Sequence, residues 1–256
     1  VLAGVAHAPV GSALAGTALA LGGTTRALGR SPQTAQAVPL TNHLAVLPRA
    51  TWGADLAPKG PMGPEDVRFL LVHHTATSNR IPDQRQLIRN IFAFHTSNAK
   101  RWNDVAYNYF VGPDGTVWEG RAGSLGGPVV ADATGGNQGF SQLVCLLGDF
   151  STTAPPAAMQ HSLVLLLAHL SQRYNLSTWK DATNSFVSRG SNRWPAGRPV
   201  EARTISGHRD MTFTACPGNA AYGLLDDWRA RVHPIVAASW VRPGLQPAVR
   251  SRLEAP

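Results

Sequence analysis

Short apolar runs and amphipathic stretches follow one another along the middle of the chain. Runs rich in β-branched and aromatic residues predict strands at 67–73, 105–111, 116–119, 143–147 and 202–206. Helical spacing of apolar residues predicts three helices, which begin after residues 83, 156 and 218. Strands and helices in this order predict an α/β fold, in which helices flank a central mixed β-sheet.

The predicted helices have recognisable start signals and apolar faces. Asp83 is an N-cap signal with Gln86 three residues further on, and Pro156 opens the second helix. The apolar faces consist of Leu87, Ile88, Ile91, Phe92 and His95, then of Met159, Leu163, Leu166, Leu167 and Leu170, and finally of Tyr222, Leu225, Trp228 and Val232. A turn at 113–115 predicts that the second and third strands form a hairpin.

The two ends of the chain differ in composition from its middle. Residues 1–46 are rich in Ala, Gly, Ser, Thr and Pro, which predicts a flexible N-terminal arm or linker. Alternatively, residues 11–23 resemble a weak signal-peptide core that lacks its basic start. We expect a single catalytic domain over 47–240, with a polar, Arg-rich surface insertion at 177–199, and a basic, Pro-containing tail over 241–256.

The charge of the chain limits the classes of partner. The formal net charge is +8, which fits an anionic partner or simple solubility equally well. Arg and Lys are scattered rather than interleaved with aromatic residues, so no nucleic acid is expected. The chain has no apolar stretch of about 18 residues, so no membrane span is expected either.

Two segments carry candidate metal ligands. His73 and His74 end the first predicted strand, and His208 and Cys216 lie within a second, distant segment. Successive strand residues point to opposite faces, so only one of the two adjacent histidines can reach a given metal. Two imidazoles and a thiolate with one position open are typical of a catalytic Zn²⁺. Such an ion activates water near neutral pH, so hydrolysis of an amide or an ester is the reaction expected.

The chain has two cysteines, and they leave an alternative open. Cys145 lies in an apolar run and is predicted to be a small buried hydrophobic residue, which leaves Cys216 for the metal. The alternative is a structural protein held together by a Cys145–Cys216 disulfide bond.

Seven segments between residues 49 and 233 resemble one known family. These segments are residues 49–53, 72–76, 102–109, 112–121, 147–150, 207–210 and 214–218. In this order and spacing they are similar to the family of peptidoglycan recognition proteins and type-2 N-acetylmuramoyl-L-alanine amidases. The resemblance implies a Zn²⁺ ion bound by His73, His208 and Cys216.

The same resemblance implies roles for other residues. Tyr107 is the expected catalytic tyrosine, and Thr214 is expected to contact the substrate carbonyl or the oxyanion. Independently of the resemblance, Asp210 follows His208 by two residues and is expected to orient a loop or a hydrogen bond next to a metal ligand. The residues expected along the substrate groove are His74, His95, Trp102, Asn108 and Asp132, of which Asp132 stands where the family usually has histidine.

The function implied by the resemblance is hydrolysis of the amide between N-acetylmuramic acid and L-alanine in peptidoglycan. The alternative is a peptidoglycan-binding module without catalysis. We expect a monomer that acts at the bacterial cell wall, either as a secreted or periplasmic bacterial enzyme or after delivery by a phage.

Overall fold

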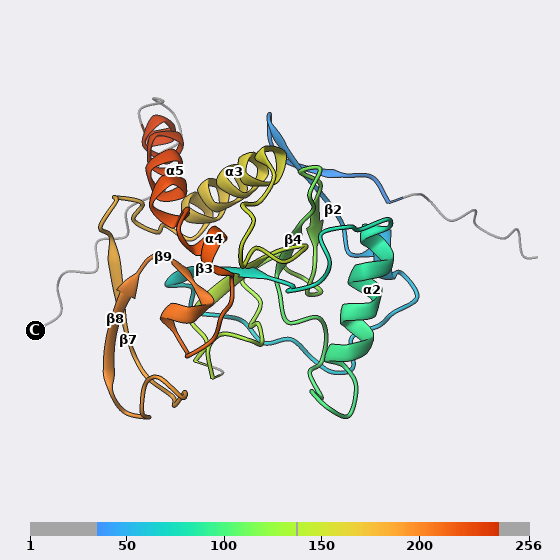
Figure 1. Cartoon of the computed structure of the whole chain (residues 1–256), viewed down its shortest axis with the longest axis horizontal. Coiled ribbons are helices and arrows are strands. Elements are labelled where there is room, and N and C mark those ends of the chain that lie inside the picture. Colours follow the sequence, from blue (N-terminus) through green and yellow to red (C-terminus); the bar gives the residue numbers. More distant parts are fainter. Residues whose placement is uncertain (1–34, 137, 241–256) are drawn as a thin grey trace, which may run out of the picture. The chain divides into compact units, whose positions relative to one another are not determined.

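A computed structural model describes residues 35–136 and 138–240, which form a seven-stranded mixed sheet with helices on both faces (Figure 1). The sheet has the order β1-β2-β5-β4-β6-β3-β9, and β7 and β8 form a separate two-stranded hairpin. The strands are β1 (Val38–Thr41), β2 (Leu44–Leu47), β3 (Phe69–His74), β4 (Tyr109–Val111), β5 (Val117–Glu119), β6 (Ser141–Leu146), β7 (Thr183–Val187), β8 (Pro199–Arg203) and β9 (Ile205–Gly207). The helices are α1 (Ala50–Gly53), α2 (Gln84–His95), α3 (Ala157–Arg173), the 3-10 turn η1 (His208–Asp210), α4 (Asn219–Tyr222) and α5 (Leu225–Trp240).

The centre of the sheet is parallel. β6 and β9 both pair with β3 in the parallel sense, and all six residues of β3 and of β6 are buried. A parallel strand that is covered on both faces requires a nearly continuous apolar sequence, which is why residues 69–72 of β3 and 143–146 of β6 are unbroken apolar runs. β4 and β5 pair in the antiparallel sense around the expected turn. The predicted α/β fold is confirmed.

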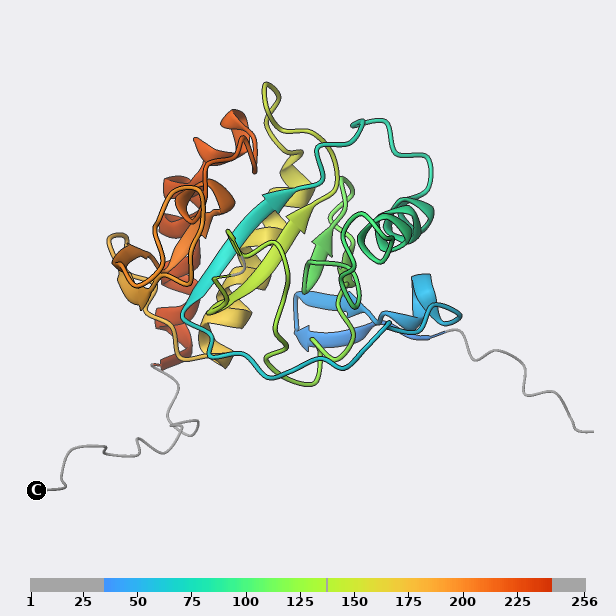
Figure 2. The ribbon, with the colours of Figure 1, turned by 90° about the horizontal axis from the view of Figure 1, so that it is seen from below.

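Alternate residues of β3 face different layers. Leu70 and Val72 pack in the cluster that contains the buried residues of α3 and α5. Phe69 and Leu71 pack on the other face, with Phe186 of β7. In Figure 2, α3 crosses behind β3 and β6, whereas α2 lies to one side of them. The two adjacent histidines at the end of β3 therefore face different layers as well.

The helices follow their start signals and apolar faces. Asp83 caps α2, since its carboxylate accepts a hydrogen bond from the Gln86 N–H group at 3.1 Å. Ile88 and Phe92 of α2 are buried, and all five residues of the predicted face of α3 are buried as well. Leu87 and Ile91 remain half-buried, because the face of α2 is wider than the surface it covers.

The boundaries differ from the predicted ones in several places. The strand predicted at 202–206 is divided between β8 and β9, and the helix predicted after residue 218 is divided into α4 and α5. β1 and all of β2 except Leu47 lie in the stretch assigned to the arm, because strands of four residues leave too short a pattern to detect. The strand predicted at 105–111 contains only 109–111. The N–H groups of Val105 and Ala106 bond to side chains instead of to a neighbouring strand. The insertion at 177–199 is not wholly on the surface, since its Phe186 is buried.

Two further expectations concern the ends of the chain. Residues 1–34 and the tail at 241–256 lie outside the described residues. Within the described part of the chain, none of the helices has the length and apolarity needed to cross a bilayer.

Candidate metal centre and cleft

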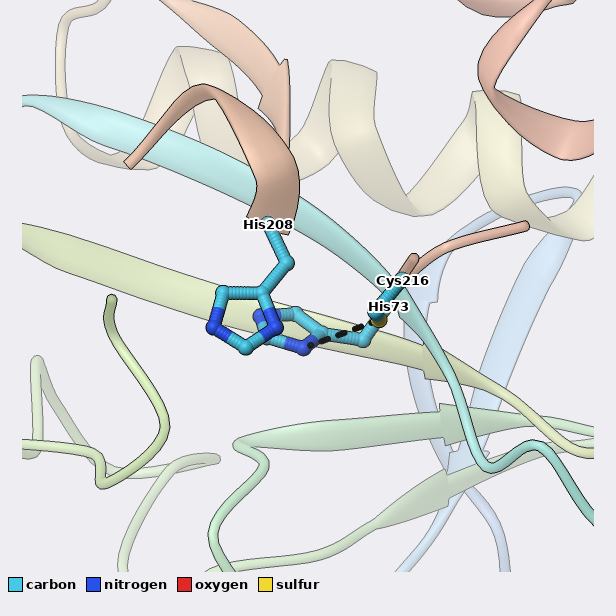
Figure 3. A group of neighbouring side chains, drawn as sticks. All are labelled: His73, His208 and Cys216. Atoms are coloured by element: carbon cyan, nitrogen blue, oxygen red, sulfur yellow. Dashed lines mark hydrogen bonds between the residues drawn. The ribbon is translucent and has the colours of Figure 1, made fainter. Parts of the chain in front are cut away.

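The parallel pairing of β3 and β9 brings the first two candidate ligands together. Val72 pairs with Gly207, so His73 and His208 follow as neighbours at the carboxyl ends of the two strands. Their rings lie 4.3 Å apart between centroids. The Cys216 Sγ atom approaches from the loop after η1 and lies 3.6 Å from His73 Nδ1 (Figure 3). Three residues from two distant segments thus meet at one edge of the sheet.

The loop that carries Cys216 is tied down by its own side chains. Asp210 accepts hydrogen bonds from the Gly207 N–H group at 2.8 Å and from the Tyr222 hydroxyl at 2.6 Å. The Arg209 guanidinium donates to the Ala215 carbonyl and to Asn219 Oδ1. These bonds set the shape of the loop before any metal binds, and they agree with the orienting role expected for Asp210.

The geometry of the three residues fits a zinc ion. One donor atom from each of His73, His208 and Cys216 lies within 4.8 Å of the others. Zn–N and Zn–S bonds of ordinary length around a tetrahedral ion put the two donor atoms about 3.6 Å apart. The Nδ1–Sγ distance in this structure is 3.6 Å.

Burial holds all three ligands in their neutral forms. Burial, with the neighbouring His208 and His74, lowers the pKa of His73 well below its ordinary value. Burial also lowers the pKa of His208 to about 4 and raises the pKa of the Cys216 thiol to about 12. Neutral imidazoles are ready to bind a metal, whereas the thiol must release its proton as the metal arrives.

Both cysteines are free. Cys145 is fully buried on β6, as predicted from its apolar surroundings, and it pairs in register with His73 of β3. The structure therefore does not contain the alternative Cys145–Cys216 disulfide bond.

Tyr107 stands beside the three candidate ligands. Its ring centroid lies 5.2 Å from that of His73, and the residue is half-buried. Burial, with the nearby Cys145 and Cys216, raises the pKa of the Tyr107 hydroxyl well above its ordinary value. The phenol therefore keeps its proton at neutral pH and can act as a hydrogen-bond donor.

A cleft of about 500 Å³ opens next to the candidate metal centre. Its lining consists of Thr75, Thr77, Leu87, Asn90, Ile91, Phe94, His95, Lys100, Trp102, Tyr107, Ala133 and His208. A second cavity of about 550 Å³ lies beside Asp210, but none of the three candidate ligands lines it. We assign the first cleft to the site because His208 and Tyr107 belong to its wall.

One wall of the cleft combines a cation with aromatic rings. The Lys100 ammonium lies 5.2 Å from the Trp102 ring and 5.7 Å from the Phe94 ring. His95 Nδ1 accepts the Ala106 N–H group at 3.0 Å, so its hydrogen is on Nε2. Burial, with Lys100 and Arg121, lowers the pKa of His95 to about 4. This histidine is therefore a neutral donor.

Of the five residues expected along the groove, only His95 and Trp102 line this cleft. His74 faces the other side of the sheet, where its Nδ1 accepts the Phe150 N–H group at 3.2 Å. His74 therefore does not line this cleft, because adjacent strand residues point to opposite faces.

Asn108 and Asp132 also lie away from the cleft. Asn108 is fully buried, where it accepts the Leu143 N–H group at 2.8 Å and donates to the Val129 carbonyl. Asp132 forms an ion pair with the buried Arg121 at 2.6 Å, because a buried guanidinium needs a carboxylate partner. Both side chains bond to residues behind the cleft, and neither of them lines it.

Thr214 lies two residues before Cys216, as the resemblance implies. Its hydroxyl accepts the Cys216 N–H group at 3.3 Å, and the residue is half-buried. Sequence reasoning missed Phe94, Lys100 and Asn90. A signal existed for α2, since Leu87, Asn90, Ile91 and Phe94 recur at helical spacing on one face.

The chain matches the family model described as N-acetylmuramoyl-L-alanine amidase (Amidase_2) over residues 63–219. This match covers more than half of the chain, which therefore belongs to this family. Its relatives include proteins named for recognition and proteins named for catalysis.

Two curated relatives illustrate this division. Peptidoglycan recognition protein 1 of Mus musculus is 27% identical over 187 residues, which cover 72% of this chain and 87% of the relative. N-acetylmuramoyl-L-alanine amidase of the same species is 30% identical over 201 residues, which cover 72% of this chain but only 31% of the relative.

Solved structures show the same fold. Peptidoglycan recognition protein-LE in complex with tracheal cytotoxin is 26% identical and has a TM-score of 0.55, with 72% of this chain and 93% of that chain covered. The amidase LysC from Clostridium intestinale is 18% identical and has a TM-score of 0.51, with 70% and 93% covered, and it bears on the fold alone.

Proposed function

We propose that this chain is a zinc-dependent N-acetylmuramoyl-L-alanine amidase of the bacterial cell wall. It hydrolyses the amide between the lactyl group of N-acetylmuramic acid and L-alanine of the stem peptide. Water adds across the C–N bond, so the lactyl group leaves as a carboxylate and L-alanine gains a free amino group. The observation that carries the proposal is the meeting of His73, His208 and Cys216 within 4.8 Å beside Tyr107.

His73, His208 and Cys216 would hold the ion. Zinc with three protein ligands and one open position supplies a Lewis acid and an activated water molecule near neutral pH. Tyr107 keeps its proton, and its hydroxyl donates a hydrogen bond to the carbonyl oxygen as negative charge develops there. Thr214 fixes the Cys216 backbone through its hydroxyl, which keeps the thiol at the edge of the site.

The cleft along α2 binds the stem peptide. Leu87, Ile91 and Phe94 offer apolar surface along one helix face, and Lys100 offers a positive charge. Stem peptides carry free carboxylates, which an ammonium group at the cleft wall attracts. His95 adds a neutral N–H donor. The relatives named peptidoglycan recognition proteins are consistent with this assignment of ligand class.

The test measures zinc and products together. Purified protein is expected to hold about one Zn²⁺ per chain, and a chelator should remove both the metal and the lytic activity. Cleavage should release new L-alanine amino termini from sacculi without new reducing sugar ends. New reducing ends would identify a glycosidase and reject the amidase. Zinc-loaded protein that binds sacculi but releases nothing would identify a recognition module instead.

A further inference from the structure

The tip of the β7–β8 hairpin, residues 188–198, holds the segment that connects two candidate ligands. Four consecutive residues of this hairpin tip bond to residues 209–213. Three side chains donate hydrogen bonds to backbone carbonyls: Ser191 to Met211, Arg193 to Arg209, and Trp194 to Asp210. Asn192 forms three further hydrogen bonds, with Thr212 and Phe213. Hydrogen bonds from the hairpin tip, which is not part of the seven-stranded sheet, therefore hold the segment between His208 and Cys216 in place.

Asn192 fixes one residue of that segment at both of its backbone groups. Its Nδ2 atom donates to the Phe213 carbonyl at 3.1 Å, and its Oδ1 atom accepts the Phe213 N–H group at 2.7 Å. The Thr212 hydroxyl donates to the same Oδ1 atom. A side-chain amide thus pairs with Phe213 as a neighbouring strand would, and it leaves the Phe213 backbone little freedom to rotate.

The Phe213 ring is nevertheless exposed. Its relative accessibility is 67%, and the Arg193 guanidinium lies 5.8 Å from the ring centroid. A single exposed phenylalanine needs no explanation on most surfaces. This one has its backbone held by two hydrogen bonds to Asn192 and lies next to Thr214, three residues before Cys216. Its backbone is therefore held within the segment that connects His208 and Cys216.

The hairpin whose tip holds the Phe213 backbone and the helix α2 that lines the cleft lie on different sides of β3. The β7–β8 hairpin and α2 flank β3 on opposite sides (Figure 1). Their buried residues also belong to different clusters, Phe186 with Met211 on one side and Ile88 with Phe92 on the other. The bond cleaved in the proposed reaction joins a sugar to a peptide, so the two halves of the substrate leave the centre in different directions. In the proposed function the cleft along α2 binds the peptide, so the sugar would lie on the side of the β7–β8 hairpin.

We infer that Phe213, held in place by Asn192, is the docking surface for the sugar ring of the substrate. This inference rests on the proposed function. A pyranose ring presents a face of C–H groups, and the face of an aromatic ring carries partial negative charge that attracts them. Because the Phe213 backbone is already held, less conformational entropy is lost when the sugar stacks on the ring.

The experiment compares two ligands that differ only in the sugar. One is an N-acetylmuramyl tripeptide, and the other is the same tripeptide that carries only the lactyl group. Dissociation constants from calorimetry and kcat/KM are measured for zinc-loaded wild type and for Phe213→Ala. The preference of the wild type for the muramyl ligand should fall by about two- to tenfold in Phe213→Ala, as expected for loss of one aromatic contact. Values for the lactyl ligand should not change.

Two variants serve as matched controls. Phe213→Tyr keeps the aromatic face and should keep the preference for the sugar. Phe94→Ala removes an exposed aromatic ring from the α2 side, so it should weaken both ligands by the same factor. An unchanged preference in Phe213→Ala would overturn the inference. Wild type that cleaves neither ligand would reject the proposed function, while the ratio of dissociation constants still decides the role of Phe213.

Discussion

At the scale of single residues, the adjacent pair His73 and His74 shows how one strand serves two purposes. His73 faces His208 and the Cys216 thiol, whereas His74 faces the layer of α3 and α5 and accepts the Phe150 N–H group. The two imidazoles have the same chemistry, and only the pleat of β3 separates their roles.

Replacing each histidine by alanine should therefore produce different defects. His73→Ala removes a metal ligand, so the purified protein should lose its zinc and its activity. His74→Ala leaves the Phe150 N–H group buried without a partner, which should lower the free energy of unfolding by about 1–3 kcal/mol but leave zinc bound. Metal content and thermal melting of both variants check this. Zinc loss in His74→Ala only would mean that the ligand is misassigned by one residue.

Tyr107 allows a test of catalysis apart from binding. Tyr107→Phe removes only the hydroxyl, and the ring keeps its contacts with His73 and Phe110. Loss of one donor to a developing oxyanion should lower kcat by a factor of about 10²–10³, with little change in zinc content. Turnover measured on a muramyl peptide decides the matter, and an unchanged kcat would leave Tyr107 as a packing residue. Thr214→Ala should have a milder effect.

At the scale of elements, the β7–β8 hairpin has a role that its polar sequence conceals. Its buried Phe186 anchors it on the sheet, and its tip bonds to the backbone of the segment between His208 and Cys216. The insertion therefore supports the shape of the candidate metal centre although it contributes no ligand.

Asn192→Ala should weaken zinc binding without removing a ligand. The substitution breaks three hydrogen bonds to Thr212 and Phe213, so the segment before Cys216 gains freedom that metal binding must remove again. The zinc dissociation constant should rise by about tenfold, a typical effect of losing a partner that orients a ligand. Competition with a chromogenic chelator measures it.

Asn184→Ala is the matched control within the same hairpin. Asn184 bonds to the Arg68 carbonyl and to Thr204, at the opposite end of the hairpin from the tip. Its loss should reduce stability but leave zinc affinity unchanged. Equal zinc affinities in Asn192→Ala and wild type would show that the loop keeps its shape without the hairpin.

At the scale of the whole molecule, the net charge of +8 predicts how the protein behaves on intact cell walls. Walls carry phosphate and carboxylate polymers, and a basic protein is attracted to them over distances that salt shortens to about 10 Å at 0.1 M. A small muramyl peptide lacks most of this charge. Raising salt from about 0.05 to about 0.5 M should weaken sacculus binding while barely changing kcat on the fragment. A pelleting assay and a turnover assay in the same buffers test this. Equal salt sensitivity would remove the role of surface charge.

The sequence by itself determined the parts of the fold that depend on local periodicity. The buried runs of β3 and β6, the N-cap at Asp83 and the apolar face of α3 all follow from residues close together in the chain. Candidate metal ligands were also identifiable, because histidine and cysteine carry chemistry that few other residue types can supply. The residues alone left His73 and His74 as alternatives, and the family resemblance favoured His73.

Tertiary structure alone decided which side chains share a space. Asn108 and Asp132 were expected in the groove. In the structure Asn108 bonds to the Leu143 N–H group and Asp132 pairs with Arg121, so both side chains lie behind the walls of the cleft. Asn192 gave no sequence signal, because a surface asparagine acquires its role only when Phe213 folds against it. Local patterns record what one segment buries, whereas a site forms where segments far apart in the chain meet, and those contacts leave no period in the sequence.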